Sequence, residues 1–262
     1  MPVYRDEDTG ITYWAPFRMN LDGEKPLLFI HGAGGNQLSW AFQKAFFEKG
    51  FFPVFLDLPG HGESEGKGEQ SIKTYARRVR SFMENLGMEK SFLIGHSMGG
   101  AIVQTLALAH PEEIRGIVLV ATGAKLRTFP AVMEGLQEDF KETVKKIVQY
   151  AYAPGTSPEM LEGGIEFLMR CPPHVLYGDF LACDRFDLMG EVGHIHLPAL
   201  IVCGKEDLLT PVNYSEFLHR QIHPSKLEIF PETGHMVMME SPGRFNEKVG
   251  QFILEIRSKA LS

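Results

Sequence analysis

The sequence predicts an α/β fold, in which a parallel sheet is covered by helices on both faces. Six short runs rich in β-branched and aromatic residues recur along the chain, at residues 27–30, 53–56, 91–94, 117–120, 199–203 and 227–230. Runs this short and this apolar are typical of strands buried on both sides. Stretches with helical spacing separate them, so we expect strands and helices to alternate.

Three helix starts support this alternation. Asn36 precedes a helical stretch over residues 37–48, Thr210-Pro211 precedes 212–221, and Ser241-Pro242 precedes 243–257. Polar side chains of this kind accept hydrogen bonds from the free N–H groups of a first turn, and proline is favoured at the first helical position. Each start therefore predicts a helix, two of them between predicted strands and the third after the last strand.

Length and charge exclude several classes of protein. A chain of 262 residues with 44% hydrophobic content can bury the core of one domain. The 26 Lys+Arg against 33 Asp+Glu give a net charge of -7, which is not the basic footprint of a nucleic-acid-binding protein. No apolar run reaches the roughly 18 residues that span a bilayer, and the charged start lacks an export signal. We expect a cytoplasmic protein with no membrane and no nucleic-acid partner; its oligomeric state stays open.

Residues 125–196 interrupt the alternation. The segment predicts one helix over 131–150, a second over 158–169 and a third after Pro172-Pro173, but no buried strand. It is too long for an ordinary connection between a strand and a helix. We interpret it as a helical cap inserted into an α/β core formed by residues 1–124 and 197–262.

Gly95-His96-Ser97-Met98-Gly99 matches G-x-S-x-G, between an apolar strand and a helical stretch over 101–109. A strand, sharp turn and helix form the nucleophile elbow, in which glycines relieve crowding around a strained serine. The serine hydroxyl then lies at a helix N-terminus, where negative charge is favoured. Ser97 is the predicted nucleophile.

A serine hydroxyl needs a base and an acid to become nucleophilic. Asp207 follows the strand at 199–203 and His235 follows the strand at 227–230, so both lie in loops at the carboxyl edge of the sheet. We expect Asp207 to orient His235. The alternatives for the acid are the adjacent Glu206 and, from the cap, Asp184 and Asp187.

The glycine-rich stretch 31–36 follows the first predicted strand and brings backbone close to a substrate. The N–H groups of Ala33 and of Met98, the residue after the nucleophile, are the predicted donors of an oxyanion hole. A phosphate-binding loop is disfavoured because the stretch lacks both G-K-[ST] and G-x-G-x-x-G spacing. Three cysteines without C-x-x-C spacing, and histidines without H-E-x-x-H, predict no metal site and no cofactor.

Five ordered segments resemble the α/β-hydrolase superfamily, in its branch with a serine nucleophile and a short helical cap: HGAGGN (31–36), DLPGHGES (57–64), GHSMGG (95–100), LIVCGKEDLLTP (200–211) and ETGHMVMMESP (232–242). The resemblance covers nearly the whole chain. It implies a mostly parallel eight-stranded sheet, with the nucleophile after the fifth strand, the cap after the sixth, the acid after the seventh and the histidine after the eighth.

The resemblance also implies that Asp57 and His61 belong to a structural turn and have no catalytic role. Haloalkane dehalogenases and epoxide hydrolases of the superfamily carry aspartate where this chain has Ser97. Those two chemistries are therefore disfavoured.

We expect a carboxylesterase-like serine hydrolase that cleaves esters of small to medium acyl or aromatic groups through an acyl-enzyme. Alternatives on the same residues are a lactonase, a thioesterase, a C–C bond hydrolase and a cofactor-free perhydrolase; a non-enzyme alternative is a ligand receptor with little turnover. Candidate anchors for a substrate carboxylate are Arg127, Arg170 and Arg185. Adaptable or aromatic side chains are candidates for the pocket lining. These candidates are His96, Phe129, Met133, Phe140, Phe167 and Met236.

Overall fold

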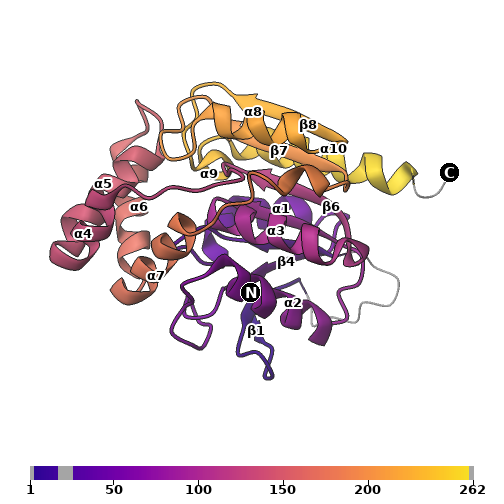
Figure 1. Ribbon diagram of the computed structural model, residues 1–262, viewed down its shortest axis with the longest axis horizontal. Helices are drawn as coiled ribbons and strands as arrows, with labels where there is room; N and C mark the ends of the chain where they lie inside the picture. Colours follow the sequence, from indigo (N-terminus) through magenta and orange to yellow (C-terminus); the bar gives the residue numbers. More distant parts are fainter. Residues whose placement is uncertain (1–2, 17–25, 260–262) are drawn as a thin grey trace.

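The computed structural model describes residues 3–16 and 26–259, which build a sheet covered by helices on both faces (Figure 1). The sheet has eight strands in the order β1-β2-β4-β3-β5-β6-β7-β8. The strands are β1 (Val3–Arg5), β2 (Thr12–Trp14), β3 (Leu27–Ile30), β4 (Pro53–Leu56), β5 (Ser91–His96), β6 (Ile114–Val120), β7 (Ala199–Gly204) and β8 (Ser225–Phe230). Pairing is antiparallel where β2 meets β1 and β4, and parallel from β4 to β8. The predicted eight-stranded, mostly parallel sheet is confirmed.

Alternating side chains of the central strands divide the core into two layers. In β3, Leu28 and Ile30 join one buried cluster, whereas Leu27 and Phe29 join the other. The first layer is covered by α2 (Ile72–Asn85), α3 (Met98–Ala109) and α8 (Val212–Gln221). The second is covered by α1 (Ala41–Phe47), α9 (Val237–Glu240) and α10 (Pro242–Lys259). Short 3-10 helices complete the connections: η1 (Gln37–Trp40), η2 (Pro111–Glu113) and η3 (Val192–His194).

Four helices lie between β6 and β7 and stand together at one end of the sheet (Figure 1). They are α4 (Pro130–Glu138), α5 (Phe140–Ala151), α6 (Pro158–Met169) and α7 (Pro173–Asp184). These inserted helices share a separate apolar cluster that includes Val144 and Leu176. Where the segment leaves and rejoins the core, Lys125 and Asp187 form an isolated β-bridge and an ion pair.

Two local predictions were wrong. The single helix expected over 131–150 is divided into α4 and α5 at Asp139, which has φ -145° and ψ 77° and caps α5 by accepting the Glu142 N–H. An aspartate is favoured at such a cap, where it ends one helix and begins the next. Thr210 does not cap α8, since its hydroxyl donates to Asp207 instead.

The six strands predicted from apolar runs are present, and β1 and β2 are additional. Each of these two strands has three residues, which is too short for a periodic pattern. In the described part of the chain, no helix combines the length and the apolar character needed to cross a lipid bilayer.

Candidate active site

Ser97 occupies the sharp turn between β5 and α3 and has φ 52° and ψ -115°, a conformation that L-residues rarely adopt. The turn is held because the Ser97 N–H donates to the Val120 carbonyl at 2.9 Å, and the Thr122 hydroxyl donates to the Ser97 carbonyl at 2.8 Å. A Cβ on Gly95 would collide with the Gly99 carbonyl, and one on Gly99 with the Ile30 carbonyl. The strain expected from the sequence is therefore present, and it needs glycine on both sides.

His235 and Asp207 form a buried pair in the loops that follow β8 and β7. His235 Nδ1 lies 2.8 Å from Asp207 Oδ2, and the two residues are 4% and 3% exposed. Because a carboxylate oxygen only accepts, Nδ1 carries the proton in this contact. The remaining ring nitrogen, Nε2, is then free to act as a base when the imidazole is neutral.

Three further hydrogen-bond donors contact the Asp207 carboxylate. Its Oδ1 accepts the N–H groups of Leu209 at 2.9 Å and Thr210 at 2.8 Å, and its Oδ2 also accepts the Thr210 hydroxyl at 2.7 Å. Burial alone would raise the pKa of Asp207, but the attraction of His235 and these hydrogen bonds outweigh it and lower the pKa. The carboxylate is held ionised, as a partner of an imidazole that takes up a proton must be.

His96, the last residue of β5, holds the loop that carries His235. Its Nε2 donates to the His235 carbonyl at 3.1 Å, and the two rings lie 4.8 Å apart. Burial first, and then repulsion from His235, lower the pKa of His96 to about 3. His96 thus stays neutral and adds no charge beside His235.

The loop 31–36 brings backbone next to Ser97, because an added Cβ on Gly32 would lie 3.1 Å from the serine Cβ. The Gly32 carbonyl accepts from His31 Nδ1 at 2.8 Å and from the Gly35 N–H at 3.1 Å. This carbonyl shares a peptide plane with the Ala33 N–H, which points the opposite way. Among the described residues, the hydrogen bonds pair neither the Ala33 N–H nor the Met98 N–H with a protein acceptor. Both N–H groups are available to a bound anion.

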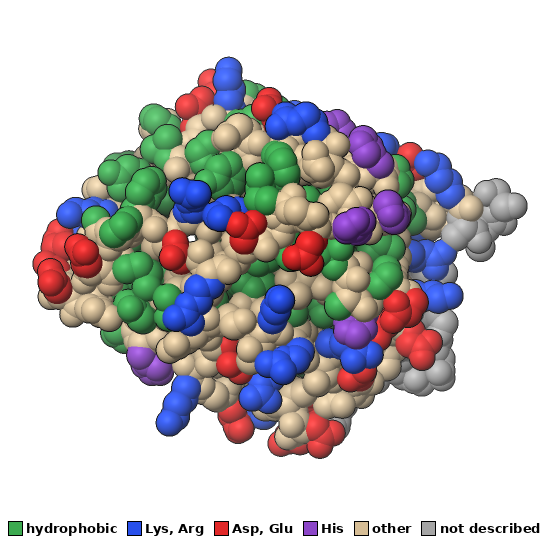
Figure 2. Space-filling model, in the orientation of Figure 1, with side chains coloured by type: hydrophobic (Ala, Val, Ile, Leu, Met, Phe, Trp, Pro, Cys, Tyr) green, Lys and Arg blue, Asp and Glu red, His purple; other side chains and the backbone are tan. Residues whose placement is uncertain are grey.

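One cavity of about 1260 Å³ lies between the carboxyl edge of the sheet and the inserted helices. Ser97, His235 and Ala33 line it together with apolar side chains of α4, α5 and α6. In Figure 2, hydrophobic side chains gather on the left of the molecule, where Figure 1 places the inserted helices. Exposed apolar residues continue the lining outward: Leu38, Phe42, Phe129, Tyr150 and Leu208.

Comparison with known proteins identifies the family of this chain. Residues 25–160 match the family described as alpha/beta hydrolase fold. The chain belongs to this family. A solved thermophilic esterase is 31% identical, with a TM-score of 0.83 and 97% of each chain covered.

Curated relatives of this α/β hydrolase include enzymes with other named substrates. A 2-hydroxy-6-oxo-6-phenylhexa-2,4-dienoate hydrolase from Comamonas testosteroni is 27% identical over 249 residues, which cover 87% of each chain. A 3-oxoadipate enol-lactonase 2 from Acinetobacter baylyi is 26% identical over 260 residues, covering 95% of this chain and 97% of the relative.

The pocket predictions for this α/β hydrolase divide into two groups. His96, Phe129, Phe167 and Met236 line the cavity. Met133 and Phe140 are not among its lining residues, which corrects the expectation. On α4, Val132 lines the cavity instead of Met133, because consecutive residues of a helix point about 100° apart. Phe140 packs against the apolar cluster of the inserted helices.

Two of the three acids weighed against Asp207 make contacts elsewhere in this α/β hydrolase. The Asp184 carboxylate accepts the Thr128 N–H, and Asp187 pairs with Lys125. The three potential metal ligands that lie together in the described chain, His110, Glu112 and Glu113, do not line the cavity.

Sequence reasoning missed Glu240, which fixes the His235 loop. Its carboxylate accepts the N–H of Gly234 at 3.0 Å and of Ala153, just after α5, at 2.9 Å. The His235 N–H in turn donates to the Ala151 carbonyl at 2.7 Å. The His235 loop is therefore joined directly to the end of α5.

Proposed function

We propose that this α/β hydrolase is a serine hydrolase that cleaves neutral carboxylic esters with apolar acyl or aromatic groups. The observation that carries the proposal is the buried His235–Asp207 pair, 2.8 Å apart, whose histidine lines the same cavity as the strained Ser97. A backbone held in an unfavourable conformation is characteristic of functional sites. Residues 125–196 would act as the cap that covers this cavity.

The reaction proceeds through an acyl-enzyme. Ser97 Oγ attacks the acyl carbon while its proton passes to His235 Nε2, and the N–H groups of Ala33 and Met98 stabilise the oxyanion. Collapse of the tetrahedral adduct breaks the ester C–O bond, and the leaving alcohol takes the proton from His235. Water then attacks the acyl carbon with His235 again as base, releasing the acid.

The charges of the cavity favour a neutral ester over the substrate named for the dienoate hydrolase, which carries a carboxylate. Among the described residues that line the cavity, the lysines and arginines are Arg127 and Lys146, and both are exposed. Arg170 and Arg185 do not line it. A carboxylate drawn into the apolar interior would lack a buried cationic partner and would lose its hydration.

The test compares Ser97→Ala with Ser157→Ala, because Ser157 also lines the cavity. On p-nitrophenyl esters, Ser97→Ala should lose at least about a thousandfold in kcat with an unchanged circular dichroism spectrum, and Ser157→Ala should stay within about threefold of wild type. A fluorophosphonate probe should label wild type and Ser157→Ala but not Ser97→Ala. Equal turnover by Ser97→Ala would refute the proposal, and an unlabelled wild-type protein would favour a ligand receptor.

A substrate panel separates the remaining activities. Esters, lactones, acyl thioesters, peracid formation and a vinylogous 1,5-diketo acid for C–C cleavage are compared by kcat/KM. Neutral esters should give the highest values. A higher kcat/KM for the diketo acid would transfer the assignment to C–C bond hydrolysis.

A further inference from the structure

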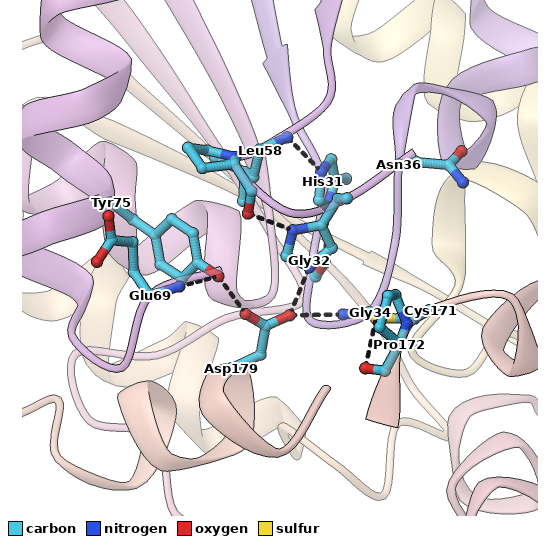
Figure 3. A network of polar contacts seen from close by, with 12 residues as sticks. His31, Gly32, Gly34, Asn36, Leu58, Glu69, Tyr75, Cys171, Pro172 and Asp179 are labelled. Carbon is cyan, nitrogen blue, oxygen red and sulfur yellow. Dashed lines mark hydrogen bonds and ion pairs between the residues drawn. The ribbon is translucent and has the colours of Figure 1, made fainter. Parts of the chain in front are cut away.

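Asp179, on α7, reaches from the inserted helices into the core and is fully buried (Figure 3). Its Oδ2 accepts the Gly34 N–H at 2.8 Å and lies 2.7 Å from His61 Nε2. Its Oδ1 accepts the Tyr75 hydroxyl at 2.6 Å. One carboxylate thus joins the glycine-rich loop, the loop after β4 and helix α2.

The hydrogen bonds of His61 define its charge. Nδ1 lies 3.1 Å from the Pro59 carbonyl and Nε2 lies 2.7 Å from Asp179, and both partners are acceptors. Both ring nitrogens must therefore carry protons, which makes His61 an imidazolium paired with the Asp179 carboxylate. Burial alone would lower the pKa of His61, but the attraction of Asp179 outweighs it and raises the pKa.

The carboxylate is also fixed in orientation. Tyr75 Oη accepts the Glu69 N–H at 2.9 Å, so its own proton is directed to Asp179 Oδ1 (Figure 3). With Oδ1 held by Tyr75 and Oδ2 held by His61, the carboxylate presents one fixed acceptor to Gly34. A buried and fully bonded ion pair of this kind is rigid.

The Gly34 contact acts on the peptide next to Ala33. Gly34 has φ +66°, a left-handed conformation that favours glycine, and its N–H donates to Asp179. On the other side of Ala33, the Gly32 carbonyl is held by His31 Nδ1, and the Leu58 N–H donates to His31 Nε2 at 2.9 Å, which fixes the tautomer (Figure 3). Both peptide planes that flank Ala33 are therefore restrained, one by the core and the other by α7.

We propose that Asp179 is a positioning residue that holds the Ala33 N–H in the direction needed to bind the oxyanion, so that helix α7 completes the reaction centre. This inference rests on the proposed function, because it assumes that Ser97 forms a tetrahedral adduct. Asp179 touches neither the reacting atoms nor the substrate; it acts through the Ala33–Gly34 peptide.

Two variants distinguish the effect of Asp179 as a hydrogen-bond acceptor from the effect of its negative charge. Asp179→Asn removes the charge but keeps a carbonyl oxygen that can accept the Gly34 N–H. The double variant Asp179→Leu/His61→Leu removes the acceptor together with both charges, and replacing a whole buried ion pair by apolar residues often preserves folding. Asp184→Asn is the matched control, because Asp184 lies on the same helix and is exposed.

The readouts are kcat, KM and the affinity for an arylboronic acid, which forms a tetrahedral adduct with an activated serine. The double variant should lose about tenfold to a hundredfold in kcat with KM within about threefold, since misplacing a donor costs part of what deleting it costs. The affinity for the boronic acid should fall by the same factor. Asp179→Asn and Asp184→Asn should both stay within about threefold of wild type.

Three results would overturn the inference: a folded double variant with wild-type kcat, a lower kcat without weaker boronate binding, or an Asp179→Asn variant as slow as the double variant. Hydrogen exchange on the wild-type chain keeps the inference testable if the double variant does not fold. Boronate binding should slow amide exchange in residues 31–36 and in α7 together, and protection of the loop without α7 would contradict the coupling. Failure of wild type to bind the boronic acid would count against the proposed function instead.

Discussion

Asp207→Asn should inactivate the enzyme by reversing the tautomer of His235, and the surroundings of Asp207 dictate how. Oδ1 faces the N–H groups of Leu209 and Thr210, which can only donate. The amide oxygen of the new side chain must stay at this position, because its NH₂ group would face two donors there. The NH₂ group is therefore forced to the Oδ2 position, 2.8 Å from His235 Nδ1.

An NH₂ group donates to Nδ1, so the imidazole proton moves to Nε2 and the base toward Ser97 is lost. In serine hydrolases that use a Ser-His-Asp relay, this change costs about ten thousandfold in kcat, which corresponds to about 5.5 kcal/mol in activation free energy. The two backbone N–H groups keep their acceptor, so the melting temperature should change little.

Stopped-flow or steady-state hydrolysis of a p-nitrophenyl ester measures the effect, with Glu206→Gln as the matched control for the neighbouring carboxylate. Glu206→Gln should stay within about twofold of wild type. If Asp207→Asn kept more than about a tenth of wild-type kcat, Asp207 would not be the group that orients His235, and the argument from its donors would fail.

Three further predictions concern stability and substrate size. Gly99→Ala should cost about 1–3 kcal/mol of unfolding free energy in urea titrations, because the added Cβ meets two backbone carbonyls. Gly163→Ala, with nothing within 4 Å of the added carbon, should be neutral or stabilising, and equal effects of the two variants would contradict this. The unfolding free energy should fall as pH drops below about 6.5, by up to about 1.4 kcal/mol per pH unit from His96 alone. The reason is that His96 binds a proton in the unfolded chain but not in the folded chain, where its pKa is about 3. His96→Gln should lose this contribution, and an unchanged slope of unfolding free energy against pH would refute it. Phe129→Ala should raise KM about threefold to tenfold for long-chain p-nitrophenyl esters without lowering the melting temperature, because this side chain is 71% exposed at the cavity rim. A KM of the variant that did not depend on ester chain length would argue against contact between Phe129 and the substrate.

The part of the site that local chemistry determines could be predicted from the sequence. Glycines around Ser97 indicated a strained turn, and apolar strands ending before Asp207 and His235 located their loops on one edge. The strands β1 and β2 escaped detection because three residues give no period. The residues that depend on packing between distant segments also escaped detection.

Asp179 illustrates this limit. It lies in the middle of a helix with no motif around it, and its role depends on how α7 meets the loops that carry Gly34 and His61. The pocket predictions failed for the same reason at Met133 and Phe140, because composition identifies a helix as apolar but not which side faces the substrate. Thr210 resembled an ordinary helix cap until the Asp207 carboxylate was found within reach of its hydroxyl.

The inserted helices are attached to the proposed reaction centre at two separate points, through Asp179 to the Gly34 loop and through Ala151 and Ala153 to the His235 loop. Specificity engineering can exploit this division of labour. Side chains on the cavity faces of α4 and α6 can be randomised to accept new acyl groups. Replacing residues 125–196 by a segment from another protein would succeed only if that segment supplied equivalent contacts to the Gly34 loop and the His235 loop.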